Sequence, residues 1–377
     1  MIWLALPALA AASYYLLAIV AAARWRGVRS TAAQSSAPPP VSILKPVRGR
    51  DPRFYEAIRS HAEQDYPEFE MLFGAVDPRD PAIQDIERLR REFPALRIAL
   101  HVISTSAPNA KAGVLAELTR HARHPVLLVN DSDIRVAPGY LRAVTAPLAD
   151  AAAGAKAGAK VGMVTCLYRA RAESWPSRAE ALGIATEFAP SVLVARMLGQ
   201  AEFALGSTMV FRAEVLREAG GFEAIADYLA DDYQLGWHIH RRGYRIVFAP
   251  EVVETDLGGE SWAQTWKHQV RWSRTIRVSR PQGFYGYVVT HATLWALVAF
   301  AAGQWWAGAA ALGLRLIAGV WIGAGILQYR RTLSDAWLIP LRDLFGFAVW
   351  LAGSVGKTVE WRGEKLRLSA DGKIRRA

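Results

Sequence analysis

Two aspartates, Asp131 and Asp133, follow the apolar run 125–129 in the stretch PVLLVNDSDIR. Residues two apart on an extended segment point to the same side. Two carboxylates that converge at the end of a buried strand would suit a hard divalent cation that also holds phosphate oxygens. The alternative is a simple turn, because Asp and Ser are favoured in turns and at helix caps.

A second pair of acids, Asp231 and Asp232, lies in the stretch YLADDYQLG at the start of a predicted helix. One of them could act as a general base that takes the proton from an acceptor hydroxyl. The alternative is that they complement the positive end of the helix dipole. Lys111, in the stretch NAKAG, is either a solvated lysine or a phosphate contact near a helix N-terminus.

The scaffold that must position these residues is predicted to be an α/β fold with a mostly parallel sheet flanked by helices. Short apolar runs alternate with amphipathic stretches, which is typical of parallel sheets covered on both faces. Ligands bind such sheets at the carboxyl ends of the strands, where we expect Asp77 and Asp131. The predicted strands are 41–47, 69–76, 96–103, 125–131 and 161–168, and the predicted helices include 81–93 and 109–122.

The composition separates this chain from ordinary soluble enzymes. Of its 377 residues, 52% are hydrophobic and 14 are Trp, and the net charge is +11 (45 basic minus 34 acidic). A basic chain can bind nucleic acid or an anionic membrane surface, and the long apolar runs favour the membrane. We therefore expect no nucleic-acid partner. Cys166 is the only cysteine, which excludes an intramolecular disulfide.

The N-terminus predicts a transmembrane anchor over residues 1–24. Residues 2–23 carry no charge, and about twenty apolar residues span a bilayer as a helix. A cleaved signal peptide would carry basic residues before its apolar run, whereas the three arginines of 24–29 follow this one. Because basic residues stay on the cytoplasmic side, the next domain is expected in the cytoplasm. Residues 25–40 read as a linker of small residues and proline.

Residues 41–260 form the predicted globular domain, and residues 261–284 predict a basic amphipathic helix on anionic lipid. Arg271 in this helix could also serve a diphosphate through bidentate hydrogen bonds. The helix carries Trp262, Trp266 and Trp272 among the basic residues Lys267, Arg271, Arg274, Arg277 and Arg280.

Residues 285–357 predict a C-terminal membrane region with apolar runs at 287–303, 307–329 and 336–356. Arg315 lies in the second run, and Arg342 and Asp343 interrupt the third, although charges inside a membrane are costly. If all three runs crossed, the basic tail at 358–377 would lie outside, against the positive-inside rule. We therefore expect one run to lie in the interface or to re-enter, and the tail to stay in the cytoplasm.

Together these stretches resemble family-2-type glycosyltransferases with a GT-A fold, and more narrowly the ceramide glucosyltransferase family (family 2/21 type). The matches run in order over nearly the whole chain, which is more specific than any one motif. Bacterial members of the family include the hopanoid-biosynthesis glycosyltransferases, and the Ala- and Arg-rich composition favours that branch. The matching stretches are SILKPVRGRDP, VDPRDPAI, NAKAG, VNDSDIRV, LADDYQLG, QVRWSR and EWRGEKLRL.

The resemblance implies a role for each acidic residue. Asp77 matches the family's first aspartate, which binds the uridine. Asp131 matches the second aspartate, and with Asp133 it forms a D-x-D pair that holds Mg²⁺ or Mn²⁺. Asp232 matches the third aspartate, which is the expected catalytic base.

The resemblance also assigns donor-binding positions. Arg271 and Trp272 match the end of a (Q/R)-x-x-R-W motif, and Pro46 and Lys111 lie in two of the matching stretches. The chain departs from the motif at its first position, which is His268. A processive polysaccharide synthase is expected to carry glutamine there. The histidine that ceramide enzymes carry upstream of the third aspartate is not evident at 186–199, which counts against ceramide as acceptor.

The activity that the resemblance implies is an inverting, metal-dependent transfer from a UDP-sugar to a hydroxyl of a membrane lipid. The expected sugar is N-acetylglucosamine and the expected acceptor is bacteriohopanetetrol, with synthesis of glucosylceramide as the alternative. Two further functions compete with these, a processive polysaccharide synthase and an inactive membrane scaffold. The expected location is the bacterial inner membrane, with the catalytic domain in the cytoplasm.

Overall fold

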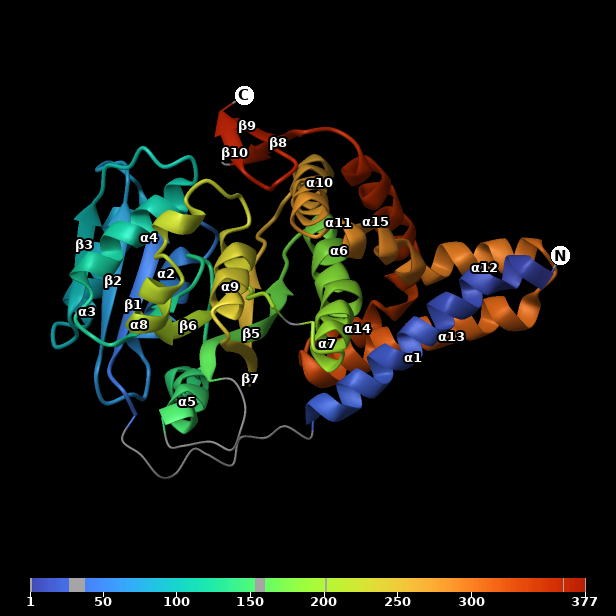
Figure 1. The fold of residues 1–377 in the computed structure, drawn as a ribbon, viewed down its shortest axis with the longest axis horizontal. Coiled ribbons are helices and arrows are strands. Elements are labelled where there is room, and N and C mark those ends of the chain that lie inside the picture. The colour runs from blue at the N-terminus through green and yellow to red at the C-terminus, as the bar shows by residue number, and fades with distance from the viewer. Residues whose placement is uncertain (1, 27–37, 153–159, 201, 362, 377) are drawn as a thin grey trace.

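The computed structural model describes residues 2–26, 38–152, 160–200, 202–361 and 363–376 (Figure 1). Most of the predicted linker at 25–40 and part of the stretch AAAGAKAGAK at 151–160 lie outside the described residues. The described chain forms a sheet domain, a projecting group of helices, and a small C-terminal sheet.

The central sheet has seven strands in the order β3-β2-β1-β4-β6-β5-β7. All neighbours pair in parallel except β6, which runs antiparallel to both β4 and β5. The predicted mostly parallel α/β fold is therefore confirmed. The strands are β1 (Val41–Val47), β2 (Phe69–Ala75), β3 (Ile98–Val102), β4 (Val126–Val129), β5 (Val161–Arg171), β6 (Met209–Arg212) and β7 (Arg245–Asp256).

The strands are continuous apolar runs because helices cover both faces of the sheet. In β4, Val126 and Leu128 join one buried cluster, whereas Leu127 and Val129 join the cluster on the other face. The first face is covered by α2 (Phe54–Ala62), α3 (Ala82–Glu92) and α5 (Tyr140–Ala152). The second face is covered by α4 (Ala110–His121), α8 (Ala213–Glu218) and α9 (Asp231–Arg241).

The predicted helices at 81–93 and 109–122 are α3 and α4. The cap of α4 explains why it begins at Ala110. The side chain of Asn109 accepts a hydrogen bond from the backbone N–H of Ala112 at 3.2 Å, which satisfies one of the free donors at the helix start. The cap thereby places Lys111 in the first turn of the helix.

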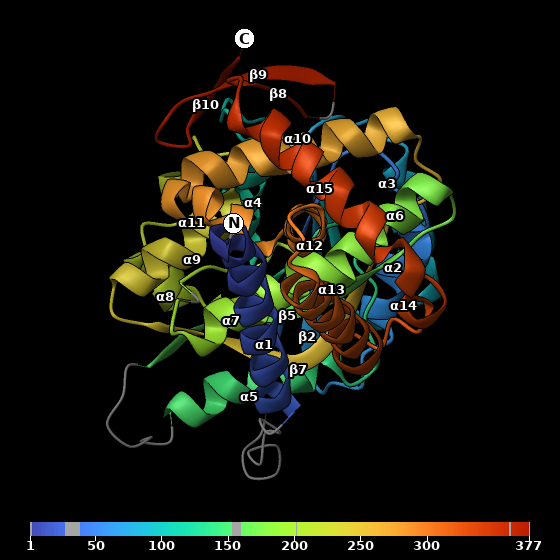
Figure 2. The same ribbon diagram turned by 90° about the vertical axis from the view of Figure 1, so that its right-hand side faces the viewer.

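Three helices project together from the sheet domain: α1 (Leu6–Arg26), α12 (Ala292–Ala301) and α13 (Trp305–Val320) (Figure 2). By length and composition, three described helices could cross a membrane: Trp3–Trp25, Trp305–Ile326 and Ala336–Ser354. The first predicted C-terminal run lies in a bent pair of helices, Pro281–Thr290 and Ala292–Ala301, whose 49° bend is that of a broken span or a re-entrant loop.

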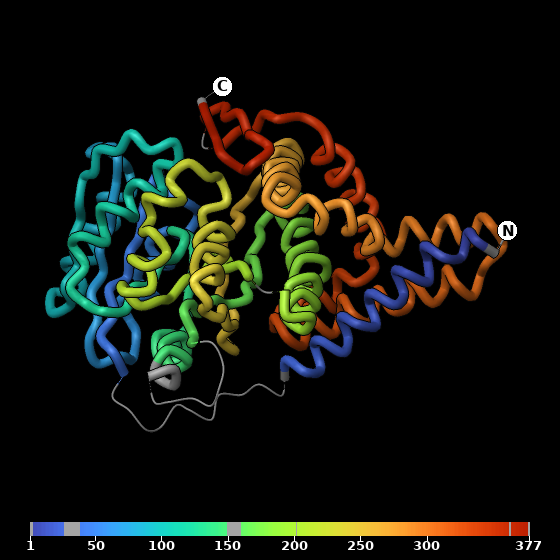
Figure 3. The backbone as a smooth tube through the Cα atoms, in the orientation of Figure 1, coloured from blue at the N-terminus to red at the C-terminus, as the bar shows by residue number. Residues whose placement is uncertain are grey.

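Two helices lie across the base of this projection. α10 (Trp262–Ser279) and α15 (Ile339–Ser354) pack on each other there, so closely that a Cβ on Gly353 would overlap with Oγ of Ser273. The connecting elements α6 (Trp175–Gly183), the π-helical turn Ile184–Phe188 and α7 (Ala189–Met197) run between the sheet and the projecting helices (Figure 3).

The C-terminal tail, predicted only as a basic segment, forms a three-stranded antiparallel sheet. It packs on the sheet domain, because the N–H of Ile374 donates to the carbonyl oxygen of Asp227 at 2.7 Å. The tail therefore packs with the sheet domain and not with the far end of the projecting helices. The strands are β8 (Thr358–Trp361), β9 (Glu364–Leu368) and β10 (Ile374–Arg376).

Candidate active site

The segment after β4 is a turn and not the extended strand end that the sequence predicts. β4 ends at Val129, and the N–H of Ile134 donates back to the carbonyl oxygen of Asp131 at 3.4 Å. The backbone here is therefore a turn, which is the alternative that the sequence left open, and not the extended segment on which the pairing of Asp131 and Asp133 was argued. Each carboxylate has its own partner: Asp131 faces Lys111, and Asp133 accepts a hydrogen bond from the hydroxyl of Thr255.

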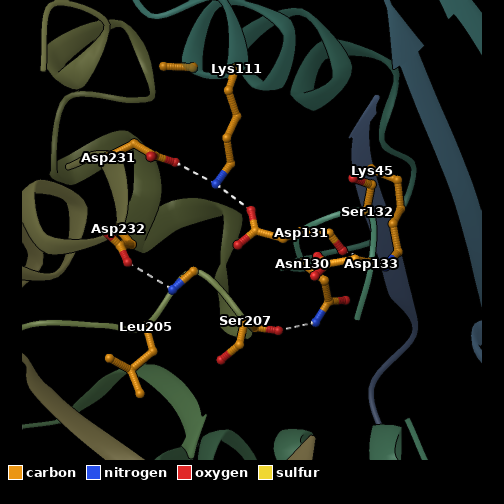
Figure 4. A network of polar contacts seen from close by, with 12 residues as sticks. Lys45, Lys111, Asn130, Asp131, Ser132, Asp133, Leu205, Ser207, Asp231 and Asp232 are labelled. Carbon is orange, nitrogen blue, oxygen red and sulfur yellow. Dashed lines mark hydrogen bonds and ion pairs between the residues drawn. The ribbon is translucent and has the colours of Figure 1, made fainter. Parts of the chain in front are cut away.

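Lys111 joins two acidic positions that lie 100 residues apart in the sequence (Figure 4). Its Nζ lies 2.7 Å from Oδ1 of Asp131 and 3.0 Å from Oδ2 of Asp231. Burial alone would lower the pKa of Lys111, but the charges of the two aspartates outweigh it and raise that pKa. The lysine is therefore a permanent cation at the carboxyl end of β4, which is the role expected of a phosphate contact.

Asp232 lies in the first turn of α9 and is held by two backbone amides. Its Oδ2 accepts from the N–H of Gly206 at 2.9 Å, and its Oδ1 accepts from the N–H of its neighbour Tyr233 at 2.7 Å (Figure 4). Burial, followed by the charge of Asp231, raises the pKa of Asp232 to about 6. A carboxylate with such a pKa is mostly ionised at neutral pH and remains a useful base.

Gly206 separates Asp232 from Asp131. Its carbonyl oxygen accepts from the N–H of Asp131 at 3.3 Å, while its own N–H is bound to Asp232. A Cβ on this residue would lie 3.0 Å from Oδ2 of Asp131 and 3.4 Å from Oδ2 of Asp232. The space between the two carboxylates is therefore open only because residue 206 has no side chain.

Asp133 lies half-buried in the same turn. Burial and the charge of Asp131 raise its pKa to about 6. Nearby, Nζ of Lys45 in β1 donates to the carbonyl oxygen of Asp131 at 3.2 Å, and burial lowers the pKa of this lysine to about 7. Two carboxylates that repel each other and supply only oxygen ligands fit a hard divalent cation such as Mg²⁺ or Mn²⁺.

The structure does not bring every predicted site residue into this cluster. Pro46 lies half-buried near the end of β1. Asp77 follows β2, which β1 separates from β4, and its carboxylate accepts from the N–H of Arg79 at 2.8 Å. Both residues lie at the predicted edge of the sheet.

Arg271 and Trp272 lie on α10, a different element from those that carry the aspartates. The ring of Trp272 is 4.5 Å from the ring of His268, measured between centroids. Burial and the charge of Glu180 raise the pKa of Glu260, and the positive charge of Arg271 opposes that rise. The guanidinium of Arg271 therefore lies within electrostatic reach of the Glu260 carboxylate.

Three residues of the cluster were not predicted from the sequence: Lys45, Gly206 and Thr255. The sequence could have indicated Lys45, because it is the one charged residue in the run VSILKPV. Burial of a lysine is costly unless its charge is paired or hydrogen-bonded. Gly206 and Thr255 left no such signal, because their importance depends on which distant carboxylates they meet.

Comparison with known proteins gives a family and a fold. The model of glycosyl transferase family 21 matches residues 3–374. Ceramide glucosyltransferases 3 and 1 of Caenorhabditis elegans are each 27% identical to the chain, over 243 and 216 residues. These alignments cover 63% and 56% of this chain, and 51% and 44% of the relatives. The chain thus spans about half the length of the curated relatives it matches.

A solved mannosyltransferase from Pyrobaculum calidifontis, in complex with GDP-Man and Mn²⁺, is similar over 93% of this chain and 97% of that chain. The TM-score is 0.55 and the sequence identity is 19%, so the likeness concerns the fold alone. It confirms the predicted GT-A-type fold.

Proposed function

Because the chain belongs to glycosyl transferase family 21, we propose that it is an inverting, metal-dependent enzyme that transfers a sugar from a UDP-sugar to a hydroxyl of a membrane lipid. The proposed sugar is N-acetylglucosamine and the proposed acceptor is bacteriohopanetetrol. The similarity to ceramide glucosyltransferases supports ceramide, with glucose as the sugar, as the second candidate.

The observation that carries the proposal is the placement of Asp232 beside Asp131, with only Gly206 between them. In this proposal Asp232 takes the proton from the acceptor hydroxyl, and the amide of Gly206 keeps its carboxylate in place. The hydroxyl oxygen then attacks the anomeric carbon from the face opposite to the departing UDP. A single displacement of this kind inverts the anomeric centre and gives a β-glycoside from an α-linked donor.

The donor side of the site has the charges that a nucleoside diphosphate needs. Asp131 and Asp133 would hold Mg²⁺ or Mn²⁺, which when bound would neutralise negative charge on the diphosphate. The ammonium of Lys111 lies within ion-pair distance of Asp131, so it would share its charge with an incoming phosphate. We also assign donor contacts to Asp77 for the uridine and to Arg271 for the diphosphate.

We assign two further contacts, one to the donor and one to the lipid acceptor, from the places of Pro46 and Trp272 in the fold. Pro46 lies at the end of β1 beside Lys45, and we assign it to the wall of the donor site. Trp272 lies on α10 at the base of the projecting helices, where a lipid acceptor would reach the site. Trp is favoured at membrane interfaces, which supports this role.

We further propose that the protein lies in the bacterial inner membrane with the sheet domain in the cytoplasm. The apolar helices support the membrane, and the arginines that follow the first helix support the orientation.

The test is transfer from radiolabelled UDP-N-acetylglucosamine and UDP-glucose in membranes that contain this protein. Bacteriohopanetetrol or ceramide is supplied, with Mg²⁺ or with EDTA, and membranes without the protein are the control. Labelled hopanoid that disappears with EDTA is the expected result. Labelled ceramide would show that ceramide is the acceptor and would leave the proposed reaction unchanged. Labelled polymer formed without a lipid acceptor would indicate a processive synthase. No label from either donor would contradict the proposal.

A further inference from the structure

A second group of potential metal ligands includes none of the aspartates of the candidate active site. It consists of Glu180 on α6, Glu260 in the loop between β7 and α10, and His268 on α10. One ligand atom from each residue lies within 4.8 Å of the others. Burial and the charges of Glu180, Asp232, Asp131 and Asp133 together raise the pKa of Tyr168, so Tyr168 on β5 lies within electrostatic reach of both sites.

Glu180 is the unusual member of the group. Its side chain is fully buried, and among the described residues neither carboxylate oxygen finds a hydrogen-bond partner. A buried carboxylate without a partner is costly, and native proteins rarely leave one unsatisfied. Its position therefore points to a ligand that the protein atoms alone do not supply.

Glu180 also contacts His268 without forming a hydrogen bond to it. Nδ1 of His268 lies 2.8 Å from Oε1 of Glu180, yet the two groups are not aligned for a hydrogen bond. The two atoms are thus close enough to bind one ion, and neither is occupied by a hydrogen bond to the other.

Glu260, the third potential ligand, is held in place by hydrogen bonds to its loop and its carboxylate. The hydroxyl of Ser174 donates to the carbonyl oxygen of Glu260 at 2.6 Å, and the N–H of Glu260 donates to the hydroxyl of Ser177 at 3.1 Å. The hydroxyl of Thr265 donates to the Glu260 carboxylate at 3.5 Å. These bonds tie the loop to the first turn of α6 and hold the carboxylate next to Glu180.

We propose that Glu180, Glu260 and His268 bind a divalent transition-metal ion, with Zn²⁺ as the best match. An imidazole nitrogen with two carboxylates is a ligand set that Zn²⁺ uses in proteins, whereas Mg²⁺ prefers oxygen ligands and water. The site is separate from the donor-side cation at Asp131 and Asp133.

The ion would hold α10 and its side chains in place and would take no part in the transfer reaction. It would tie α6 and the loop after β7 to α10, the helix that carries Arg271 and Trp272. His268 also packs on Trp272, so a ligand on the imidazole would fix the direction of that indole ring. His268 is thus a positioning residue.

The test measures metal content without any sugar donor, so its result is independent of the proposed activity. The full-length protein in detergent is stripped with a chelator, loaded with Zn²⁺ in the absence of nucleotide, dialysed, and analysed by mass spectrometry for bound metal. We expect about one Zn²⁺ per chain. Loading with Co²⁺ instead should give a visible absorption band that reports on the ligands.

Variants of the ligands and of residues outside the group locate the ion, and each variant is checked for wild-type thermal unfolding before loading. Glu180→Gln and His268→Gln should lose the bound Zn²⁺ and the Co²⁺ band, whereas Asp131→Asn should keep both. Glu260→Gln, in a half-buried residue, is the second choice if Glu180→Gln does not fold. His240→Gln is the matched control, because His240 pairs with Glu202 at 3.5 Å outside the site.

Two results would overturn the inference. The first is wild-type protein that binds no Zn²⁺ without nucleotide, which would make the group a plain ion pair between His268 and Glu180. The second is a Zn²⁺ content that survives in both Glu180→Gln and His268→Gln, because the ion would then lie elsewhere.

Discussion

At the scale of single residues, the site depends on backbone atoms as much as on its acids. Asp232 is oriented by the amides of Gly206 and Tyr233, and the same Gly206 binds Asp131 through its carbonyl oxygen. The carboxylates are thus fixed relative to each other before any substrate binds, which is the condition for efficient catalysis. Two predictions test this arrangement.

The first prediction concerns pH. Since Asp232 must be ionised to accept a proton and its pKa is raised to about 6, kcat/KM should be low below that pH and rise to a plateau above it. Asp231→Asn removes the neighbouring charge that raises this pKa, so the rise should move to lower pH. A pH profile of both proteins provides the measurement. A rise that stays in place or moves upward would contradict the assignment.

The second prediction concerns Gly206. A methyl group there would lie 3.0 Å from Oδ2 of Asp131, which must then shift by a few tenths of an ångström, and 3.4 Å from Oδ2 of Asp232. Because small misplacements of catalytic groups are costly, Gly206→Ala should lower transfer by up to about 10²-fold. Steady-state kinetics and thermal unfolding together provide the measurement. The matched control is Gly139→Ala, where no described atom beyond the chain neighbours lies within 4 Å of the added carbon. Equal activity of the two variants would refute the role of the glycine.

At the scale of elements, the sequence predicted the strands and helices whose apolar pattern is local. Strands β1 to β5 and helices α3 and α4 lie where the alternation of apolar and amphipathic runs places them. β6 and β7 were not predicted, because the apolar run of β6 ends in Arg212 after three residues and that of β7 is interrupted by Pro250. The sequence left a turn after β4 open as an alternative to an extended strand end, because the partners of Asp131 and Asp133, which are Lys111 and Thr255, lie on other elements.

The charges in the membrane region are another feature that depends on distant partners. Arg315 and Asp343 form a buried ion pair at 2.7 Å. Taken singly, each of these charges counts against one of the predicted spans. Isolated charges are costly in apolar surroundings, but a paired guanidinium and carboxylate offset much of that cost. The pair thus explains why both helices tolerate a charge.

The third prediction tests this pair. Asp343→Ala leaves the Arg315 guanidinium buried and unpaired, and should lower stability by about 3–5 kcal/mol. Arg315→Met combined with Asp343→Leu should recover most of that loss. Thermal unfolding in detergent measures both effects. For comparison, Glu360→Ala breaks the exposed pair of Lys267 and Glu360 and should cost at most about 1 kcal/mol. Equal losses in Asp343→Ala and Glu360→Ala would contradict the account.

At the scale of the whole molecule, the described structure is a sheet domain with one apolar projection. The N-terminus and the turn between α12 and α13 lie together at the far end of the projection (Figure 1). Trp3, Trp305 and Trp306 are largely exposed near that end, which suits the far membrane interface. α10, α15 and the C-terminal sheet remain at the near end with the sheet domain.

The fourth prediction follows from this layout. In a Cys166→Ala background, Ala301→Cys near the far turn and Ala370→Cys in the tail should react with a membrane-impermeant maleimide from opposite sides. In intact cells only the first should be labelled, and in inverted vesicles only the second. Labelling of both positions from one side would show that the projection does not cross the membrane.

The central claim is that the acids around Gly206 form the active site, and the fifth prediction tests it most directly. Transfer by Asp232→Asn is compared with transfer by the wild type and by Asp65→Asn, which changes an exposed aspartate far along the chain. Loss of a general base costs about 10²–10⁴-fold, so Asp232→Asn should fall by that factor while Asp65→Asn stays at the wild-type rate. Wild-type turnover in Asp232→Asn would place the base elsewhere and contradict the account.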